Sequence, residues 1–156
     1  MFMTESLKLS TQQIGKLGEL LVQYRLLEIA IESAQLTTDA GIDLVAYSNR
    51  RKEAITIQVK TNLKPKPGGG KGKLALDWWV PHNSPAALFA LVDLSDRRVW
   101  IFTREEMKVK AQQQPEGRLH FYIHTEQNVK RRKDAPAASL QDFEEYLLER
   151  RIETFF

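Results

Sequence analysis

Four polar residues in the first part of the chain are of types that can act together on a phosphodiester: Glu19, Asp43, Gln58 and Lys60. Cleavage of that bond needs a hard cation that polarises the phosphoryl oxygen and lowers the pKa of the attacking water. Magnesium takes oxygen ligands and keeps several waters beside one or two carboxylates. Asp43 can therefore ligate the ion directly, Gln58 through its side-chain carbonyl and Glu19 through a water. Lys60 supplies a positive charge for the phosphate or for the nucleophilic water.

The stretch AITIQVKT, residues 54–61, predicts a short strand that carries two of these residues. Side chains alternate across a sheet, so Gln58 and Lys60 share one face with Thr56, at a spacing of roughly 7 Å. On a buried face both polar side chains need partners, because removing them from water costs free energy. On a solvent-exposed face they need none, and a Q-x-K pair in a strand is more often of this second kind.

A helix predicted over about residues 11–31 positions Glu19. Its apolar residues recur at helical spacing, and Glu19 lies on a stripe with Gly15. Gly15 and Gly18 each weaken a helix by up to ~1 kcal/mol, which indicates close packing against another element. Glu19 is therefore expected near that packing interface. The alternative is a surface position on a helix whose buried stripe is shifted.

Asp43 stands at the start of a second predicted strand, IDLVAYS, residues 42–48. The polar turn SNRRK joins this strand to residues 54–61, so the two are expected to form an antiparallel hairpin. A suitable register of that hairpin brings the Asp43 carboxylate close to the polar face of the second strand.

The remaining elements predict an α/β (α+β) fold. The run AALFALVDL is apolar without alternation, as in a strand that is covered on both faces, and VWIFT and LHFYIHT are further strands. Thr103 and Glu106 form a capping-box pattern that opens a helix to about Gln113, as Ser10 and Gln13 do for the first helix. The order of helix, several strands, helix, strand and helix predicts a mixed β-sheet with flanking helices.

Length and composition predict one folded domain over residues 1–156. We place its motif-bearing core at about residues 11–125 and a C-terminal helix at about 139–151. No apolar run approaches the ~20 residues of a membrane helix, and the N-terminus lacks the apolar segment of a secretory signal. A chain without cysteine fits a reducing compartment, so we expect a cytoplasmic protein with no membrane partner.

Four lysines follow the strand in the segment NLKPKPGGGKGK: Lys64, Lys66, Lys71 and Lys73. The prolines and glycines predict a mobile loop, and the pattern of a phosphate-binding P-loop is absent. The lysines could contact a nucleic-acid backbone, each contact adding to the salt dependence of binding. A plain connector is an equally good interpretation. The net charge of +3 and the basic run VKRRK are compatible with a nucleic-acid partner and do not require one.

Aromatic and histidine side chains later in the chain give weaker signals. Trp78 and Trp79 point to opposite faces of a strand, so at least one belongs to the core and the other could stack on bases. His120 and His124 share a strand face at roughly 13 Å from each other, which is too far to hold one ion. We interpret the two histidines as structural.

The order of GKLGE, GIDL and IQVKT resembles the PD-(D/E)XK nuclease superfamily, which has the restriction-endonuclease-like fold. The resemblance implies an α-β-β-β-α-β core and a magnesium site, with manganese as a substitute, formed by Glu19, Asp43, Gln58 and Lys60. It also implies DNA as the expected substrate and a homodimer that cuts two strands. Glutamine at position 58 departs from the usual carboxylate and is similar to the PD-(D/Q)XK variant of an intron-encoded homing endonuclease branch.

Three functions stay open at this point. The first is a metal-dependent endonuclease that hydrolyses phosphodiester bonds in nucleic acid, with DNA expected before RNA. The second is a nucleic-acid-binding module with the same fold and no turnover, because Gln58 removes one negative charge and weakens the affinity for metal. The third is a protein-interaction domain whose polar strand face binds a partner chain.

Overall fold

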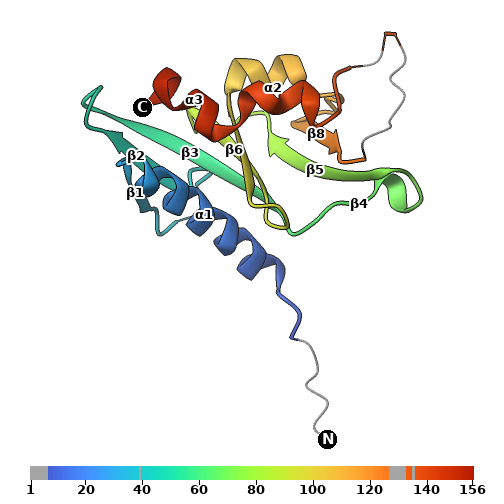
Figure 1. The fold of residues 1–156 in the computed structure, drawn as a ribbon, viewed down its shortest axis with the longest axis horizontal. Helices are drawn as coiled ribbons and strands as arrows, with labels where there is room; N and C mark the ends of the chain where they lie inside the picture. The colour runs from blue at the N-terminus through green and yellow to red at the C-terminus, as the bar shows by residue number, and fades with distance from the viewer. Residues whose placement is uncertain (1–6, 39, 127–132, 135) are drawn as a thin grey trace, which may run out of the picture.

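A five-stranded mixed sheet is the scaffold of the fold (Figure 1). The computed structural model describes residues 7–38, 40–126, 133–134 and 136–156. In sheet order the strands are β1 (Glu32–Gln35), β2 (Leu44–Ser48), β3 (Glu53–Asn62), β6 (Leu88–Asp93) and β7 (Arg98–Thr103). β2 and β3 form the predicted antiparallel hairpin, β3 runs parallel to β6, and β6 is antiparallel to β7. The predicted α+β fold with a mixed sheet and flanking helices is confirmed.

A second, three-stranded sheet was not expected from the sequence. It consists of β4 (Lys66–Pro67), β5 (Leu74–Pro81) and β8 (Arg118–His124). Parallel strands such as β3 and β6 need a long crossover connection. The chain makes this crossover through β4, the 3₁₀ turn η1 (Gly68–Gly70) and β5, rather than through a helix. Since alternate residues of β5 and β8 are buried, these two strands form a layer with one apolar face.

Two capping boxes begin the first two helices as predicted. They open α1 (Thr11–Glu28) and α2 (Arg104–Lys110), with Ser10 and Thr103 as the respective N-caps. Both helices are shorter than expected, because Ala30 takes a φ of 61° after α1 and Ala111 is extended, with a ψ of 128°, after α2. Within the described residues, no helix is both long and apolar enough to cross a membrane.

The C-terminal segment, expected as one helix over about residues 139–151, forms two shorter pieces. They are the 3₁₀ helix η2 (Gln141–Tyr146) and the α-helix α3 (Leu148–Phe155). Leu147 between them is extended, with a ψ of 137°, so the helical hydrogen bonds cannot continue through it.

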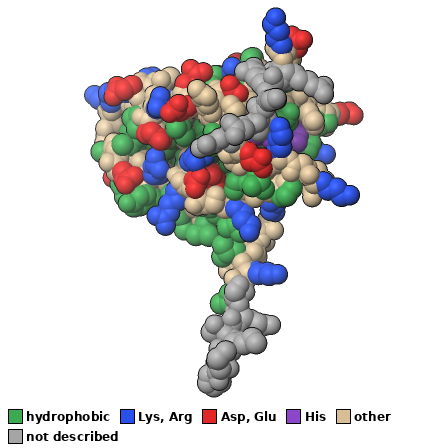
Figure 2. All heavy atoms as spheres, turned by 45° about the vertical axis from the view of Figure 1, so that its right-hand side comes forward, with side chains coloured by type: hydrophobic (Ala, Val, Ile, Leu, Met, Phe, Trp, Pro, Cys, Tyr) green, Lys and Arg blue, Asp and Glu red, His purple; other side chains and the backbone are tan. Residues whose placement is uncertain are grey.

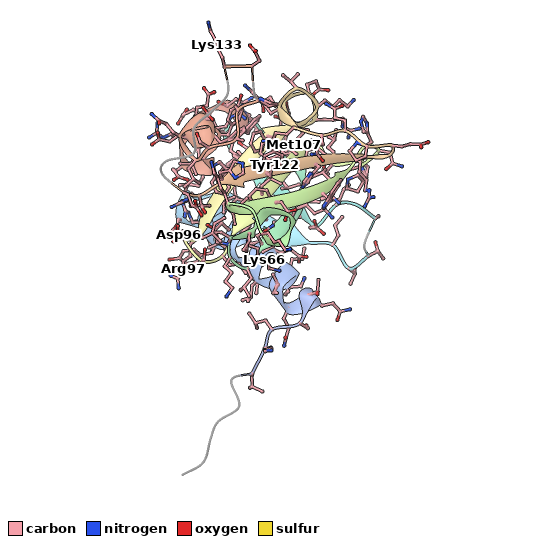
Figure 3. All side chains as sticks on the ribbon, turned by 90° about the vertical axis from the view of Figure 1, so that its right-hand side faces the viewer. Lys66, Asp96, Arg97, Met107, Tyr122 and Lys133 are labelled. Atoms are coloured by element: carbon pink, nitrogen blue, oxygen red, sulfur yellow. The ribbon has the colours of Figure 1, made fainter. Side chains whose placement is uncertain are left out.

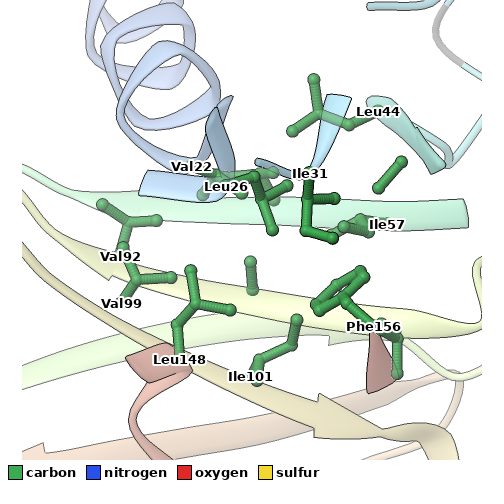
Figure 4. Close-up of a cluster of buried hydrophobic side chains, with 14 residues drawn as sticks. Val22, Leu26, Ile31, Leu44, Ile57, Val92, Val99, Ile101, Leu148 and Phe156 are labelled. Carbon is green, nitrogen blue, oxygen red and sulfur yellow. The ribbon is translucent and has the colours of Figure 1, made fainter. Parts of the chain in front are cut away.

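Two apolar clusters lie on opposite faces of the five-stranded sheet. One packs α1 and α3 on the sheet, and Figure 4 shows Val22 and Leu26 of α1 meeting Ile57 of β3. The other fills the space between the two sheets around Trp78, whose side chain is 2% exposed. β6 contributes to both clusters and is buried along its whole length, as its unbroken apolar run predicted.

The close approach of α1 to β3 depends on Gly18. A Cβ at Gly18 would lie 1.8 Å from Oγ1 of Thr61, whereas a Cβ at Gly15 would meet no atom within 4 Å. The predicted close packing is therefore right for Gly18 and wrong for Gly15, which lies on the open side of the helix.

These two glycines predict opposite effects of the same substitution. Gly18→Ala should lower the free energy of unfolding by about 1–3 kcal/mol, because the helix must move away from β3. Gly15→Ala should raise it by up to about 1 kcal/mol through helix propensity alone. Urea unfolding of the two variants beside the wild type measures both, and equal effects would contradict the close contact.

Arg151 joins the C-terminal helix to α2 and β7. Its guanidinium donates to both carboxylate oxygens of Glu106, at 2.6 and 2.7 Å, and to the backbone carbonyl of Ile101 at 2.9 Å. Burial alone would raise the pKa of Glu106. The hydrogen bonds from Arg151 and from the Thr103 backbone, with the charge of Arg151, outweigh burial and hold the pKa below its usual value.

A lowered pKa in the folded state stabilises the protein above the unfolded pKa, and this contribution is lost as the pH falls through the folded pKa. We therefore expect Glu106→Gln to lower the urea midpoint at neutral pH. The gap between wild type and variant should shrink as the pH falls below the ordinary glutamate pKa of about 4.3 and through the lower pKa of folded Glu106. A gap of constant size across this range would show that the charge of Glu106 contributes nothing.

Candidate functional site

The Asp43 side chain is bonded to the strand that carries Gln58 and Lys60. Asp43 lies directly before β2, and its Oδ2 accepts a hydrogen bond of 2.7 Å from the backbone N–H of Val59. Its own N–H donates to the carbonyl of Ile57 at 2.9 Å. The β2–β3 register pairs Leu44 with Ile57, so Asp43 stands opposite Gln58. Paired residues of antiparallel strands share a face, and the hairpin therefore places both side chains on one side of the sheet.

Gln58 is a buried polar residue whose side-chain oxygen is desolvated. Its side chain is 4% exposed, and its Oε1 has no hydrogen-bond partner within the described residues. The cross-strand neighbour of Gln58 on β6 is Phe89, a member of the apolar cluster between the sheets. A buried acceptor left unpaired costs about 1–3 kcal/mol, so this oxygen is available for a ligand that would satisfy it.

Lys60 follows on the same face of β3 and is partly buried. Its register partner is Leu91 of β6, which belongs to the same apolar cluster as Phe89. In the described part of the chain its ammonium group makes neither a hydrogen bond nor an ion pair. The end of β3 thus presents a cation that no described side chain neutralises.

Glu19 lies on α1, on the other side of the sheet, and is bound by Lys16, which is not among the predicted site residues. Lys16 forms an ion pair of 2.5 Å with Glu19, whose side chain is 18% exposed, and also donates to Oε1 of Gln35 at 3.1 Å. Gly18 of α1 packs on Thr61 of β3. Glu19 is the next residue after Gly18, and Lys60 is the residue before Thr61. The helix therefore brings Glu19 to this end of β3, but its bonded partner is Lys16.

The turn that precedes Asp43 is held by the loop between β5 and β6. Gly41 has a φ of +80°, and a Cβ there would lie 2.8 Å from Cδ of Pro85. Ser84 donates from its Oγ to the carbonyl of Gly41 at 3.2 Å, and the Ala87 N–H donates to Oγ1 of Thr56 at 2.9 Å. Sequence reasoning missed this loop, because a contact between residues so far apart in the chain leaves no local pattern.

The donor set fits a hard divalent cation. Asp43 offers carboxylate oxygens and Gln58 an unpaired amide oxygen, both of the type that magnesium takes. Within the described ranges, no three His, Cys, Asp or Glu side chains are grouped so as to hold a metal ion. Magnesium usually needs only one or two carboxylates from the protein and keeps its waters, so a larger acidic cluster is not required.

Three of the four lysines, Lys66, Lys71 and Lys73, lie on the hairpin of β4 and β5, and Lys64 lies in the connection from β3, where the sequence predicted a loop. Lys66 is part of β4, which pairs with β5, and η1 makes the turn between them. All four side chains are exposed: Lys64, Lys66, Lys71 and Lys73. The basic run VKRRK lies outside the described residues except for Lys133.

Comparison with known proteins identifies the fold. No protein-family model matches the chain, and no curated protein matches it either. One solved structure, a bacterial homing endonuclease described as I-Ssp6803I, matches with a TM-score of 0.57 over 92% of this chain and 93% of that chain. The two sequences are 14% identical, so the likeness extends to the fold and not to individual residues.

Because the buried Oε1 of Gln58 has no partner among the described residues, we expect this side chain to lower the stability of the fold. Gln58→Leu should raise the free energy of unfolding by about 1 kcal/mol, because it removes a desolvated acceptor. The same variant should weaken Mn²⁺ binding, measured by electron paramagnetic resonance.

Thr61→Val is the matched control, since Oγ1 of Thr61 is also buried, has no hydrogen-bond partner among the described residues, and faces α1. It should be at least as stable as the wild type and bind Mn²⁺ equally well. Unchanged Mn²⁺ binding by Gln58→Leu would remove this residue from the site.

Proposed function

We propose that the protein is a metal-dependent endonuclease that hydrolyses phosphodiester bonds in DNA. The observation that carries this proposal is the pairing of Asp43, fixed to β3 through the Val59 N–H, with the unpaired buried oxygen of Gln58. The ammonium of Lys60, on the same strand face as Gln58, adds the positive charge that a phosphate needs. The fold shared with a bacterial homing endonuclease supports the same reading.

Each residue has a role that its chemistry allows. Asp43 and Gln58 would hold Mg²⁺ or Mn²⁺ through their oxygens, and a bound cation of this kind polarises a phosphoryl oxygen and acidifies water. Lys60 would donate to a phosphate oxygen, where negative charge develops, or orient the nucleophilic water. Glu19 would accept a hydrogen bond from a water in the metal's shell and must share its carboxylate with Lys16.

These roles match the PD-(D/Q)XK form of the PD-(D/E)XK superfamily, to which we assign the chain by its residue order. A duplex has two strands to cut, so we expect the protein to act as a homodimer. A cytoplasmic location remains the expectation from the absence of cysteine.

A nucleic-acid-binding module without turnover is the second candidate. Two observations favour it: the neutral Gln58 in place of a carboxylate, and the ion pair that engages Glu19. Both lower the negative charge available to a metal ion. This candidate predicts binding that weakens steeply with salt and no cleavage with any metal.

The test of the proposal is cleavage of a panel of labelled duplex DNA, single-stranded DNA and RNA with Mg²⁺ and with Mn²⁺. Wild-type protein should cut DNA, and Asp43→Ala and Lys60→Ala should each reduce the rate by about 10²–10³, the loss expected for one electrostatic contact to the transition state. Glu19→Gln should have a smaller effect.

Glu145→Ala and Lys108→Ala are charge-matched controls on the exposed surfaces of η2 and α2. They should cut as the wild type does. Cleavage that survives in Asp43→Ala and Lys60→Ala would place the activity elsewhere. Absence of cleavage by the wild type, together with salt-sensitive binding, would favour the binding module and make Gln58→Glu the next variant.

A further inference from the structure

The outer face of the second sheet has a pocket of about 380 Å³ to which Asp43, Gln58 and Lys60 do not contribute. The strand registers explain why it exists. Ala75, on the central strand β5, is paired with Lys66 of β4 on one side and with His124 of β8 on the other. A methyl group between two long side chains leaves a hollow, and the turn of Gly68 and Gly69 closes one side of it. Its volume is within the ~300–1,000 Å³ of small-ligand sites.

One wall of the pocket is aromatic. The rings of His120 and Tyr122 are 5.6 Å apart and those of Tyr122 and His124 are 5.5 Å apart, which makes a continuous row along β8. Trp79 extends this row by stacking on His120 at 4.0 Å, and its ring also lies 4.8 Å from the guanidinium of Arg118. The ring surface that remains for a ligand is therefore that of the β8 residues, and a planar ligand fits it best.

Polar groups of the residues that line the pocket can form hydrogen bonds with the edge of a planar ligand. Nδ1 of His124 is buried and has no hydrogen-bond partner within the described residues. The carboxylate of Asp77, 57% exposed, lies 3.2 Å from Nε2 of His120 and can accept a hydrogen bond from it. A nucleobase combines a flat π surface with donors and acceptors on its edge, which is the chemistry these groups complement.

Positive charge surrounds the entrance on the β4 side. Lys66 lines the pocket, Lys71 and Lys73 are exposed on the same hairpin, and Lys64 is exposed in the connection just before β4. Figure 2 shows Lys and Arg side chains among Asp and Glu side chains on the face it presents, and Figure 3, turned further about the same axis, labels Lys66 and Tyr122. A ligand with phosphates next to its base therefore finds cations where its backbone would lie.

We propose that this pocket seats one unpaired nucleobase of a DNA strand whose backbone lies along the lysines of the β4–β5 hairpin. A base within a duplex keeps both faces stacked on its neighbours, so only an unpaired or flipped base can enter. The inference rests on the proposed function for the class of its ligand. It does not require cleavage, since base binding and phosphodiester hydrolysis use different residues.

The experiment measures binding of a labelled single strand and of the matching duplex, in EDTA so that metal-dependent cleavage cannot contribute. Ala75→Leu fills the pocket, and Tyr122→Leu removes its central ring. Each should weaken single-strand binding about tenfold, the loss of one base–aromatic contact, and change duplex binding little. Tyr24→Leu is the matched control, because Tyr24 is an aromatic residue on α1 with 60% exposure and should leave both affinities unchanged.

The outcomes separate this inference from the proposed function. A wild-type protein that cuts no DNA, but whose single-strand affinity falls in the two pocket variants, would contradict the proposed function and leave the pocket in place. Equal losses for single strand and duplex would assign the face to backbone contacts alone and overturn the inference. Wild-type affinity in both pocket variants, each shown to be folded by circular dichroism, would also overturn it. Displacement of the strand by free mononucleotides at equal nucleotide concentration would overturn it as well, because it would show that the backbone along the lysines adds nothing to binding.

Discussion

The hydrogen bond from the Val59 N–H to the Asp43 carboxylate is the interaction on which the candidate site depends. It extends the β2–β3 ladder by one side chain beyond the last backbone pair, so the carboxylate is fixed by the same register that aligns the hairpin. A one-residue slip would move Gln58 to the α1 face and Ile57 to the other. The apolar cluster under α1 contains Ile57 and so resists that slip. The hydrophobic core and the polar site are therefore aligned by one register.

The same strand explains why a glutamine can be buried at position 58 without disrupting the fold. Ile57, at the neighbouring position, is fully buried against α1 and supplies the apolar area that holds β3 in place. The desolvation of one amide is of the order of ~1–3 kcal/mol, which burial of one or two large apolar side chains offsets. Selection for stability alone would favour an apolar residue in this environment. The ligand role proposed for Gln58 would account for a polar side chain at this position.

Local patterns predicted local structure, and contacts between distant residues account for what they missed. The capping boxes at Ser10 and Thr103 are formed within four residues, and the hairpin that opposes Asp43 to Gln58 needs only one short turn. The second sheet needs pairing between strands that are far apart in the sequence, which leaves no local pattern. The ion pair of Lys16 with Glu19 does have a local signal, the i,i+3 spacing of opposite charges on a helix. The pocket at Ala75 depends on two registers at once, which no single stretch of sequence encodes.

Asn62, the last residue of β3, fixes the second sheet to the first. Its side chain accepts from the Asp77 N–H at 3.2 Å and donates to the Asp77 carbonyl at 2.6 Å, so an amide side chain takes the place of a further strand beside β5. Asp77 lines the pocket, and Lys60 lies two residues before Asn62 on the same strand. A nucleic acid bound at the candidate site and in the pocket would span the end of β3. The hydrogen bonds of Asn62 to the backbone of β5 would fix the distance between the two binding surfaces, where a flexible linker would not. A rigid connection of this kind lowers the entropic cost of engaging both surfaces at once.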